Sequence, residues 1–170
     1  MLLLGAAALV ITLSHDAGGQ PPPTSTTSRA QHLAQLRAEA VAFAETFFNR
    51  DDAAAAAGDP RMIDDIYVPG TNLSKAVKKQ IADRRAHGVV HVTKSHTEQV
   101  EVLSVDETKA EVRFLTIITD SVVKDIRTGK VTHRFGTGQR MWRLRLARIG
   151  GRWLVNALLA DDSAEQGQGG

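Results

Sequence analysis

Apolar residues in the first half of the chain recur at the spacing of a helix. Between His32 and Asn49 they lie three or four positions apart, which predicts an amphipathic helix that packs against a core. A short helix over Ala53–Ala57 follows, and a third is predicted over Lys75–His87, with Ser74 as N-cap and Gly88 as its end. The apolar positions of the first and third helices are Leu33, Leu36, Ala40, Phe43, Ala44, Phe47 and Phe48, then Ala76, Val77, Ile81 and Ala82.

After Gly88 the period of the pattern changes to two, which predicts strands. The expected strands cover Val89–Val105, Lys109–Lys124, Val131–Ile149 with a bend at Gly136-Thr137-Gly138, and Arg152–Leu159. Short turn segments between successive strands favour an antiparallel meander. The predicted class is therefore α+β, with N-terminal helices packed on one face of a bent antiparallel sheet.

Both ends of the chain differ in character from this middle part. Leu2–Leu13 is almost wholly apolar, yet as a helix it covers only ~18 Å of a ~30 Å hydrocarbon core. We interpret residues 1–17 as a membrane anchor or signal-like segment, truncated here. The alternative is a buried helix or an unprocessed hydrophobic tail. Residues 18–30, with three consecutive prolines, predict a Pro/Ser/Thr linker. That leaves 31–162 as the folded domain and 163–170 as a flexible tail.

Composition narrows the class of protein without naming a ligand. With 170 residues, 42% of them hydrophobic, the chain suits one folded domain plus appendages. Lys and Arg total 21 against 19 for Asp and Glu, a net charge of +2 that is too small for a general polyanion binder. Cysteine is absent, which excludes disulfides, thiolate metal sites and a cysteine nucleophile.

Two segments resemble a known superfamily. The closing run Gly150-Gly151-Arg152-Trp153-Leu154-Val155 and the helices-then-strands order are similar to the nuclear transport factor 2-like superfamily. The run from Asp65 to Thr71, followed by a helix and Ala86-His87-Gly88, resembles uncharacterised membrane-anchored members from high-GC Gram-positive bacteria. The resemblance implies a cone-shaped pocket between the helices and the sheet. Its members include isomerases, dehydratases, polyketide cyclases, transport adaptors and type IV secretion scaffolds, so the fold does not decide the function.

Two residues are candidates for catalysis in such a pocket. Asp120 shares, by alternation, an otherwise apolar strand face, where a desolvated carboxylate could act as a general base. The alternative is that Asp120 lies in water or beside a bulge that reverses the register. Tyr67, the single tyrosine, could donate a hydrogen bond to a ligand carbonyl, or could simply pack its ring. The expected pocket-lining aromatic residues are Phe43, Phe47, Tyr67, Trp142 and Trp153.

No cofactor or metal is predicted. His87 and His91 have the spacing of a helical metal pair, but the intervening Gly88 argues against a continuous helix. The segment Gly136-Thr137-Gly138 lacks the strand–loop–helix setting of a nucleotide-binding loop. A serine hydrolase motif is also absent.

Basic residues gather near the end of the domain. Between Arg127 and Arg152 the chain has eight basic residues and no acid. We interpret four of them as an interaction strip for an acidic protein partner or an anionic envelope surface: Arg140, Arg143, Arg145 and Arg148. The alternative is a solvated face paired with glutamates on adjacent strands. Nucleic acid is not an expected partner, because no exposed aromatic residues are expected to interleave with the arginines and the expected location is outside the cytoplasm.

These observations support three hypotheses about function. The first is a non-enzymatic, membrane-tethered interaction module of a cell-envelope assembly, with the domain outside the cytoplasm. The sequence is compatible with a homodimer but does not decide the oligomeric state. The second is a small-molecule binder or an isomerase or dehydratase that uses the pocket, and the third is a secretion or conjugation scaffold. A deep pocket lined by Asp120, Tyr67 and another polar group would favour the second, and a pocket plugged by aromatic residues would favour the first.

Overall fold

The computed structural model describes residues 25–161, with side chains from Ser28. Its elements are α1 (Ser25–Ala57), the 3-10 helix η1 (Pro60–Asp65), α2 (Asn72–Ala86), β1 (Val89–Val105), β2 (Lys109–Asp125), β3 (Val131–Phe135), β4 (Gly138–Ile149) and β5 (Arg152–Ala160). The predicted anchor (1–17), the first part of the linker and the tail (163–170) lie outside the described residues. Within the described part of the chain, no helix is long and apolar enough to cross a membrane.

Helix α1 is one continuous helix of 33 residues where the sequence predicted two. It begins at Ser25, inside the predicted linker, and the expected break at Asp51-Asp52 does not occur. Alanine has the highest helix propensity, so the run after Asp52 continues the helix until Gly58, which has a φ of 63°. The predicted apolar face is confirmed, with these residues buried: Leu36, Ala40, Ala44 and Phe47.

Helix α2 begins one residue after Thr71, whose hydroxyl oxygen accepts a hydrogen bond from the Ser74 backbone N–H at 3.1 Å. Thr71 is therefore the N-cap, and the predicted cap, Ser74, is buried within the first turn. Ile81 is buried as predicted, but Ala76 and Ala82 are exposed. The expected inward face was wrong at those two alanines because the helix turns its Ser74 and Ile81 side toward the core.

The five strands form one antiparallel sheet in the order β1-β2-β4-β5, with β3 also paired to β2. One side of β2 is occupied by β1 along nearly its whole length. The other side is shared, because β4 pairs with residues 109–118 and β3 with residues 121–124. The predicted bend between Phe135 and Gly138 is confirmed as the point where the chain passes from β3 to β4.

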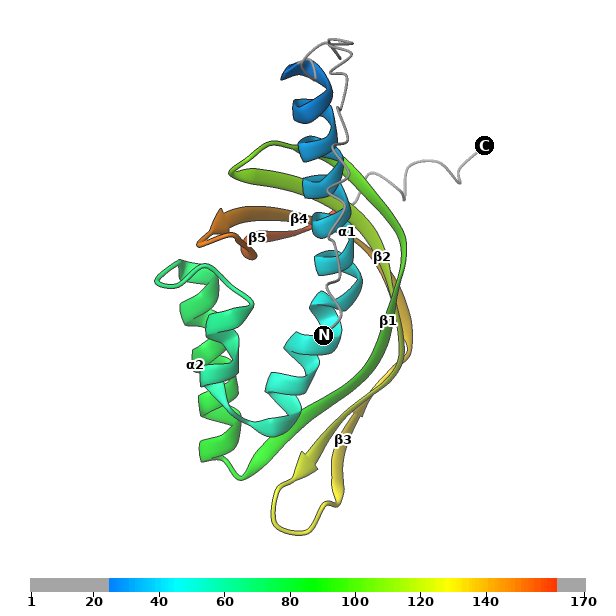
Figure 1. The fold of residues 1–170 in the computed structure, drawn as a ribbon. Coiled ribbons are helices and arrows are strands. Elements are labelled where there is room, and N and C mark those ends of the chain that lie inside the picture. Colours follow the sequence, from blue (N-terminus) through cyan, green and yellow to red (C-terminus); the bar gives the residue numbers. More distant parts are fainter. Residues whose placement is uncertain (1–24, 162–170) are drawn as a thin grey trace, which may run out of the picture.

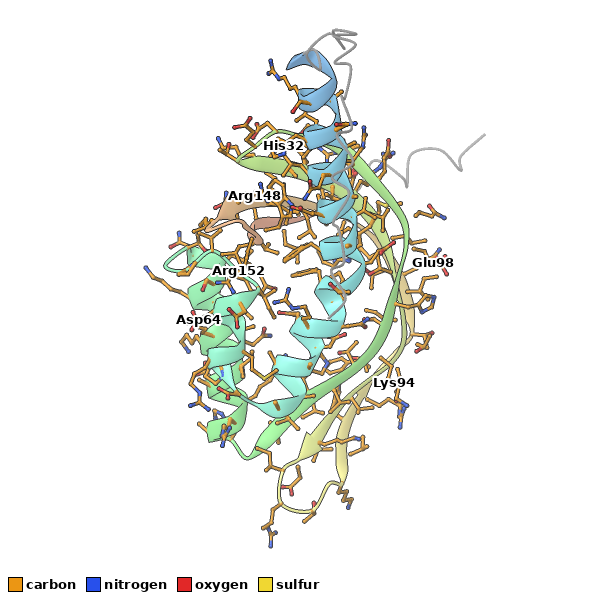
Figure 2. All side chains as sticks on the ribbon, in the orientation of Figure 1. His32, Asp64, Lys94, Glu98, Arg148 and Arg152 are labelled. Atoms are coloured by element: carbon orange, nitrogen blue, oxygen red, sulfur yellow. The ribbon has the colours of Figure 1, made fainter. Side chains whose placement is uncertain are left out.

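Both helices lie on the concave side of the bent sheet (Figure 1), and Lys94 and Glu98 project from its outer side (Figure 2). Phe47 of α1 packs edge-on against Tyr67 and Phe114, with ring centroids 5.8 and 6.5 Å apart. This aromatic cluster fills the core in the middle of the domain. Nearer the C-terminal end of α1, the space between the helices and the sheet is not filled.

Candidate functional site

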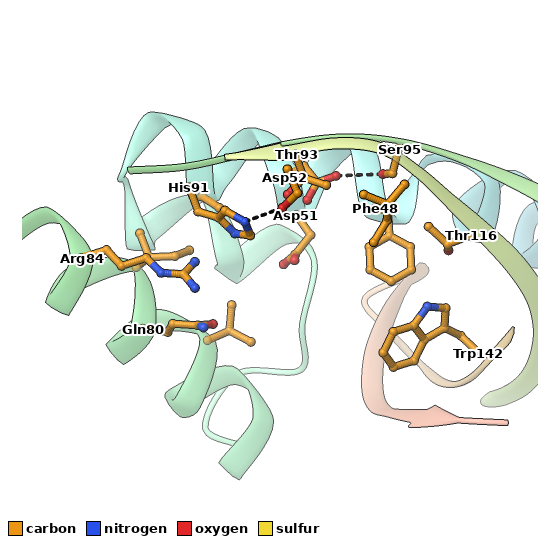
Figure 3. A pocket seen from close by; sticks show the side chains of 15 residues that line it. Phe48, Asp51, Asp52, Gln80, Arg84, His91, Thr93, Ser95, Thr116 and Trp142 are labelled. Carbon is orange, nitrogen blue, oxygen red and sulfur yellow. Dashed lines mark hydrogen bonds between the residues drawn. The ribbon is translucent and has the colours of Figure 1, made fainter. Parts of the chain in front are cut away.

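A cavity of about 250 Å³ lies between the end of α1, helix α2 and the concave side of the sheet (Figure 3). It is divided into an apolar and a polar part. The apolar wall consists of Phe48, Ala55, Val77, Ile81, Ile118 and Trp142. The polar wall consists of Asp51, Asp52, Gln80, Arg84, His91, Thr93, Ser95, Thr116 and Ser121. Such a mixture of apolar surface and a few converging polar groups is typical of small-molecule sites.

Two neighbouring carboxylates from α1 form the acidic part of the wall. The Tyr67 hydroxyl donates a hydrogen bond to Asp51 Oδ1 at 2.9 Å, and Ser95 Oγ donates one to Asp52 Oδ2 at 2.9 Å. Burial raises the pKa of Asp51, and it raises the pKa of Asp52 to about 6, although these hydrogen bonds oppose the shift. Asp52 can therefore accept or release a proton near neutral pH.

His91 faces the same cavity from β1. Its Nε2 lies 2.8 Å from Ser121 Oγ of the adjacent strand, within hydrogen-bond distance. Burial, assisted by the nearby positive charge of Arg84, lowers the pKa of His91. The imidazole is consequently neutral at pH 7, and it can donate from one nitrogen while it accepts at the other.

Thr116 supplies an unusual group to the wall. Its side chain is 1% exposed, and among the described residues its hydroxyl oxygen has no hydrogen-bond partner. Native proteins rarely leave such groups unpaired, since the cost is about 1–3 kcal/mol. Phe48 and Trp142, with ring centroids 5.8 Å apart, stand beside it (Figure 3). The cavity wall therefore includes a residue whose hydroxyl is unsatisfied, next to two aromatic rings.

Asp120 does not line the cavity. Thr119 is an extra residue in β2, because Lys94 pairs with Asp120 whereas the next residue, Ser95, pairs with Ile118. Beyond this bulge Ser121 takes the inward position and Asp120 points outward, where it accepts a hydrogen bond from Arg134 at 2.6 Å. The prediction that Asp120 faces inward, which assumed strict alternation along β2, is therefore wrong. The alternative, in which a bulge reverses the register, is the one observed.

Among the aromatic residues predicted to line the pocket, only Trp142 does so. Tyr67 is 1% exposed and reaches the cavity indirectly, through its hydrogen bond to Asp51. Its backbone joins β5 through a parallel bridge to Val155, which fixes it in the core. The other three pack away from the cavity: Phe43, Phe47 and Trp153.

The predicted interaction strip is not a single surface. Arg143 lies 3.5 Å from Glu111 and 3.3 Å from Asp161, and Arg145 lies 3.8 Å from Glu111. The other two predicted members, Arg140 and Arg148, project from the opposite face of β4. Arg148 reaches Glu39 of α1 at 3.2 Å, and Arg140 covers the ring of Trp142 at 4.9 Å. Cross-strand pairing with a glutamate, the alternative interpretation, describes Arg143 and Arg145.

The histidines do not assemble a metal site in the described part of the chain. Residues 25–161 contain no group of three or more His, Cys, Asp or Glu side chains that could hold a metal ion. His87 caps α2 and its Nδ1 lies 2.7 Å from the Asp83 carbonyl oxygen, whereas His91 belongs to the cavity.

Sequence reasoning missed most of the polar wall, although one signal was present. The helical period that places Phe47 and Phe48 on the inner face returns four residues later at Asp51 and Asp52. Continuing the predicted helix through these positions would have put both carboxylates on the inward side. His91 and Ser121 carried no comparable signal, because their contact depends on strand pairing.

Comparison with solved structures identifies the architecture. The intermembrane space region of the chloroplast protein ARC6 superposes with a TM-score of 0.56 at 14% identity, covering 74% of this chain and 95% of that one. An NTF2-like protein with a cystatin-like fold from Novosphingobium aromaticivorans gives 0.48 at 16% identity, covering 85% and 96%. The chain shares the fold of this ARC6 region, with helices on one face of a bent antiparallel sheet.

A ketosteroid isomerase-like protein from Erwinia carotovora gives a TM-score of 0.42 at 18% identity, covering 75% of this chain and 93% of that one. Identities this low establish the fold alone. No protein-family model matches the sequence, and the search of curated proteins finds no match. The function must therefore be argued from the cavity of this domain.

Proposed function

We propose that this domain binds a small organic molecule in the cavity between α1, α2 and the sheet. The observation that carries the proposal is Thr116, a residue of the cavity wall whose buried hydroxyl has no hydrogen-bond partner among the described residues. A ligand group that hydrogen-bonds to it would recover the cost of its desolvation. About 250 Å³ corresponds to the volume of roughly eight water molecules, so a ligand of about ten non-hydrogen atoms fits.

The shape and chemistry of the wall indicate how such a molecule would lie. Its apolar part would pack between Phe48 and Trp142, where aromatic surface is available. Its hydrogen-bonding groups would face Asp51 and Asp52 on α1. The rings line this cavity without filling it, which supports a binding site over a plugged core.

A second candidate function is acid–base catalysis, of the isomerase or dehydratase type. Asp52 favours it, because a carboxyl with a pKa of about 6 can take a proton from a bound substrate near neutral pH. Neutral His91, hydrogen-bonded to Ser121, would be a second group for proton transfer. Turnover that is lost in Asp52→Asn while ligand affinity is retained would support catalysis, and equal turnover in the two proteins would refute it.

The binding proposal can be tested by filling the cavity. Ala55→Met places a larger side chain on the cavity wall, and Ala82→Met makes the same change at an exposed position of α2. A fragment library of molecules with about ten non-hydrogen atoms is screened by protein-observed NMR. We expect some fragments to shift the NMR signals of cavity residues in the wild type and in Ala82→Met, and not in Ala55→Met. Fragments that bind all three proteins equally, or none that reach the cavity, would refute the proposal.

We also propose that the domain is displayed outside the cytoplasm on a membrane tether. The support is the apolar run Leu2–Leu13 and the proline-containing segment after it. The test is protease treatment of intact cells that express the chain with its natural N-terminus. Cleavage of the membrane-bound domain by external protease is expected, and full protection together with recovery in the cytosolic fraction would refute this location.

A further inference from the structure

Arg84 is a cation without a partner at the edge of the cavity. Helix α2 places Arg84 one turn after Gln80, so both side chains lie on the same face and both line the cavity. Within the part of the chain that the structure describes, no ion pair or side-chain hydrogen bond involves the Arg84 guanidinium. The adjacent Arg85 points elsewhere and donates a hydrogen bond to the Gly58 carbonyl oxygen at 3.0 Å.

Charge is unevenly distributed across the cavity. Arg84 is the one permanently cationic side chain on its wall, since the pKa of His91 is lowered and its imidazole is neutral at pH 7. The acidic residues Asp51 and Asp52 project from α1, whereas Arg84 and Gln80 project from α2 (Figure 3). Helix α2 therefore supplies hydrogen-bond donors and positive charge to the site, and α1 supplies carboxylate acceptors.

This polarity restricts the ligands that fit. An anionic group would be repelled by Asp51 and Asp52 but attracted by Arg84, so it must lie at the α2 end. A hydroxyl or amino group suits the α1 end, because Tyr67 and Ser95 each occupy only one acceptor position of those carboxylates. A single guanidinium matches the planar, singly charged carboxylate. A phosphate would carry additional negative charge toward the aspartates.

We infer that the ligand is a small carboxylic acid with a hydrogen-bond-donating group, and that Arg84 and Gln80 form its carboxylate subsite. This inference rests on the proposed binding function and specifies its ligand class. The carboxylate binds at α2, the apolar body packs against Phe48 and Trp142, and the donor group reaches Asp51 or Asp52.

The test compares 4-hydroxyphenylacetate with 4-hydroxyphenylacetamide, two probes of the same shape that differ in charge. Their binding to the full chain is measured by isothermal titration calorimetry and by protein-observed NMR. A charge-assisted hydrogen bond contributes about 1.5–3 kcal/mol, so the acid should bind about ten- to a hundredfold more tightly than the amide. Arg84→Gln should abolish this preference, and the matched variant Arg85→Gln should retain it.

Three results would overturn the carboxylate subsite: equal affinity for acid and amide, an acid preference that survives Arg84→Gln, or no binding of either probe to the cavity. The Ala55→Met fragment screen judges the binding function separately, because it does not depend on ligand charge. Fragments that bind the cavity without preferring acids would thus refute the subsite alone. Thermal melting of Arg84→Gln shows whether the variant is folded before its affinity is interpreted.

Discussion

Replacing Thr116 with valine should stabilise the free protein, although most core substitutions destabilise. The Thr116 hydroxyl oxygen is buried without a partner, and valine has nearly the same shape. The substitution removes an unsatisfied polar group, which costs about 1–3 kcal/mol, and replaces it with an apolar methyl group. Allowing for partial relaxation of the cavity, we expect the free energy of unfolding to rise by about 1 kcal/mol. The melting temperature of a domain of this size should rise by roughly 3–5 °C.

Urea unfolding followed by circular dichroism measures this difference. Thr132→Val is the matched control, because Thr132 is exposed on β3 and donates only to the Val123 carbonyl oxygen at 3.3 Å. The control should change stability by less than ~0.5 kcal/mol. A loss of 1 kcal/mol or more in Thr116→Val, with the control unchanged, would show that the hydroxyl is satisfied in the free protein. The argument that it awaits a ligand would then fail.

Three further predictions concern the core, the carboxylates and the basic residues. Phe47→Ala should cost about 3–5 kcal/mol in urea unfolding, since the ring is fully buried, and a loss below 1 kcal/mol would contradict its central packing. The pKa of Asp52 is raised in the folded state, so folding binds a proton between about pH 4 and 6 and stability falls as pH rises through that window. Asp52→Asn should lack this fall, and parallel pH–stability curves for the two proteins would refute it. Arg143→Ala should lower the free energy of unfolding by about 1 kcal/mol, and Arg145→Ala, at a more exposed side chain, by less than ~0.5 kcal/mol. A larger loss for Arg145→Ala than for Arg143→Ala in urea unfolding would contradict the assigned ion pairs.

Much of the fold could be predicted because it depends on local periodicity and turn chemistry. The bounds of β1, Val89–Val105, follow from Gly88 and from the Asp106-Glu107-Thr108 turn, where Asp106 Oδ1 accepts a hydrogen bond from the Thr108 backbone N–H. The start of α1 at Ser25 could not be predicted in this way. Its first residues, Ser25-Thr26-Thr27-Ser28, are all polar, so no apolar repeat marks them.

The candidate site was harder to predict because its residues meet through pairing between distant strands. Whether Asp120 or Ser121 faces inward depends on which residues of β1 lie opposite them. The alternation of residues within β2 alone cannot predict that pairing. The same limit applies to His91, whose partner Ser121 is 30 positions away. Arg148 lies on the same inward face of β4 as Trp142, and there it forms an ion pair with Glu39 of α1.

The bulge at Thr119 shifts the numbering of the inward positions of β2 by one residue. Loss of Thr119 alone would leave Asp120 opposite Lys94 and Ser121 opposite Thr93, so the Ser121 hydroxyl would still face the cavity and the carboxylate of Asp120 would still face outward. Alignments of homologues should therefore be inspected for gaps at this point before any residue of the second strand is assigned a role.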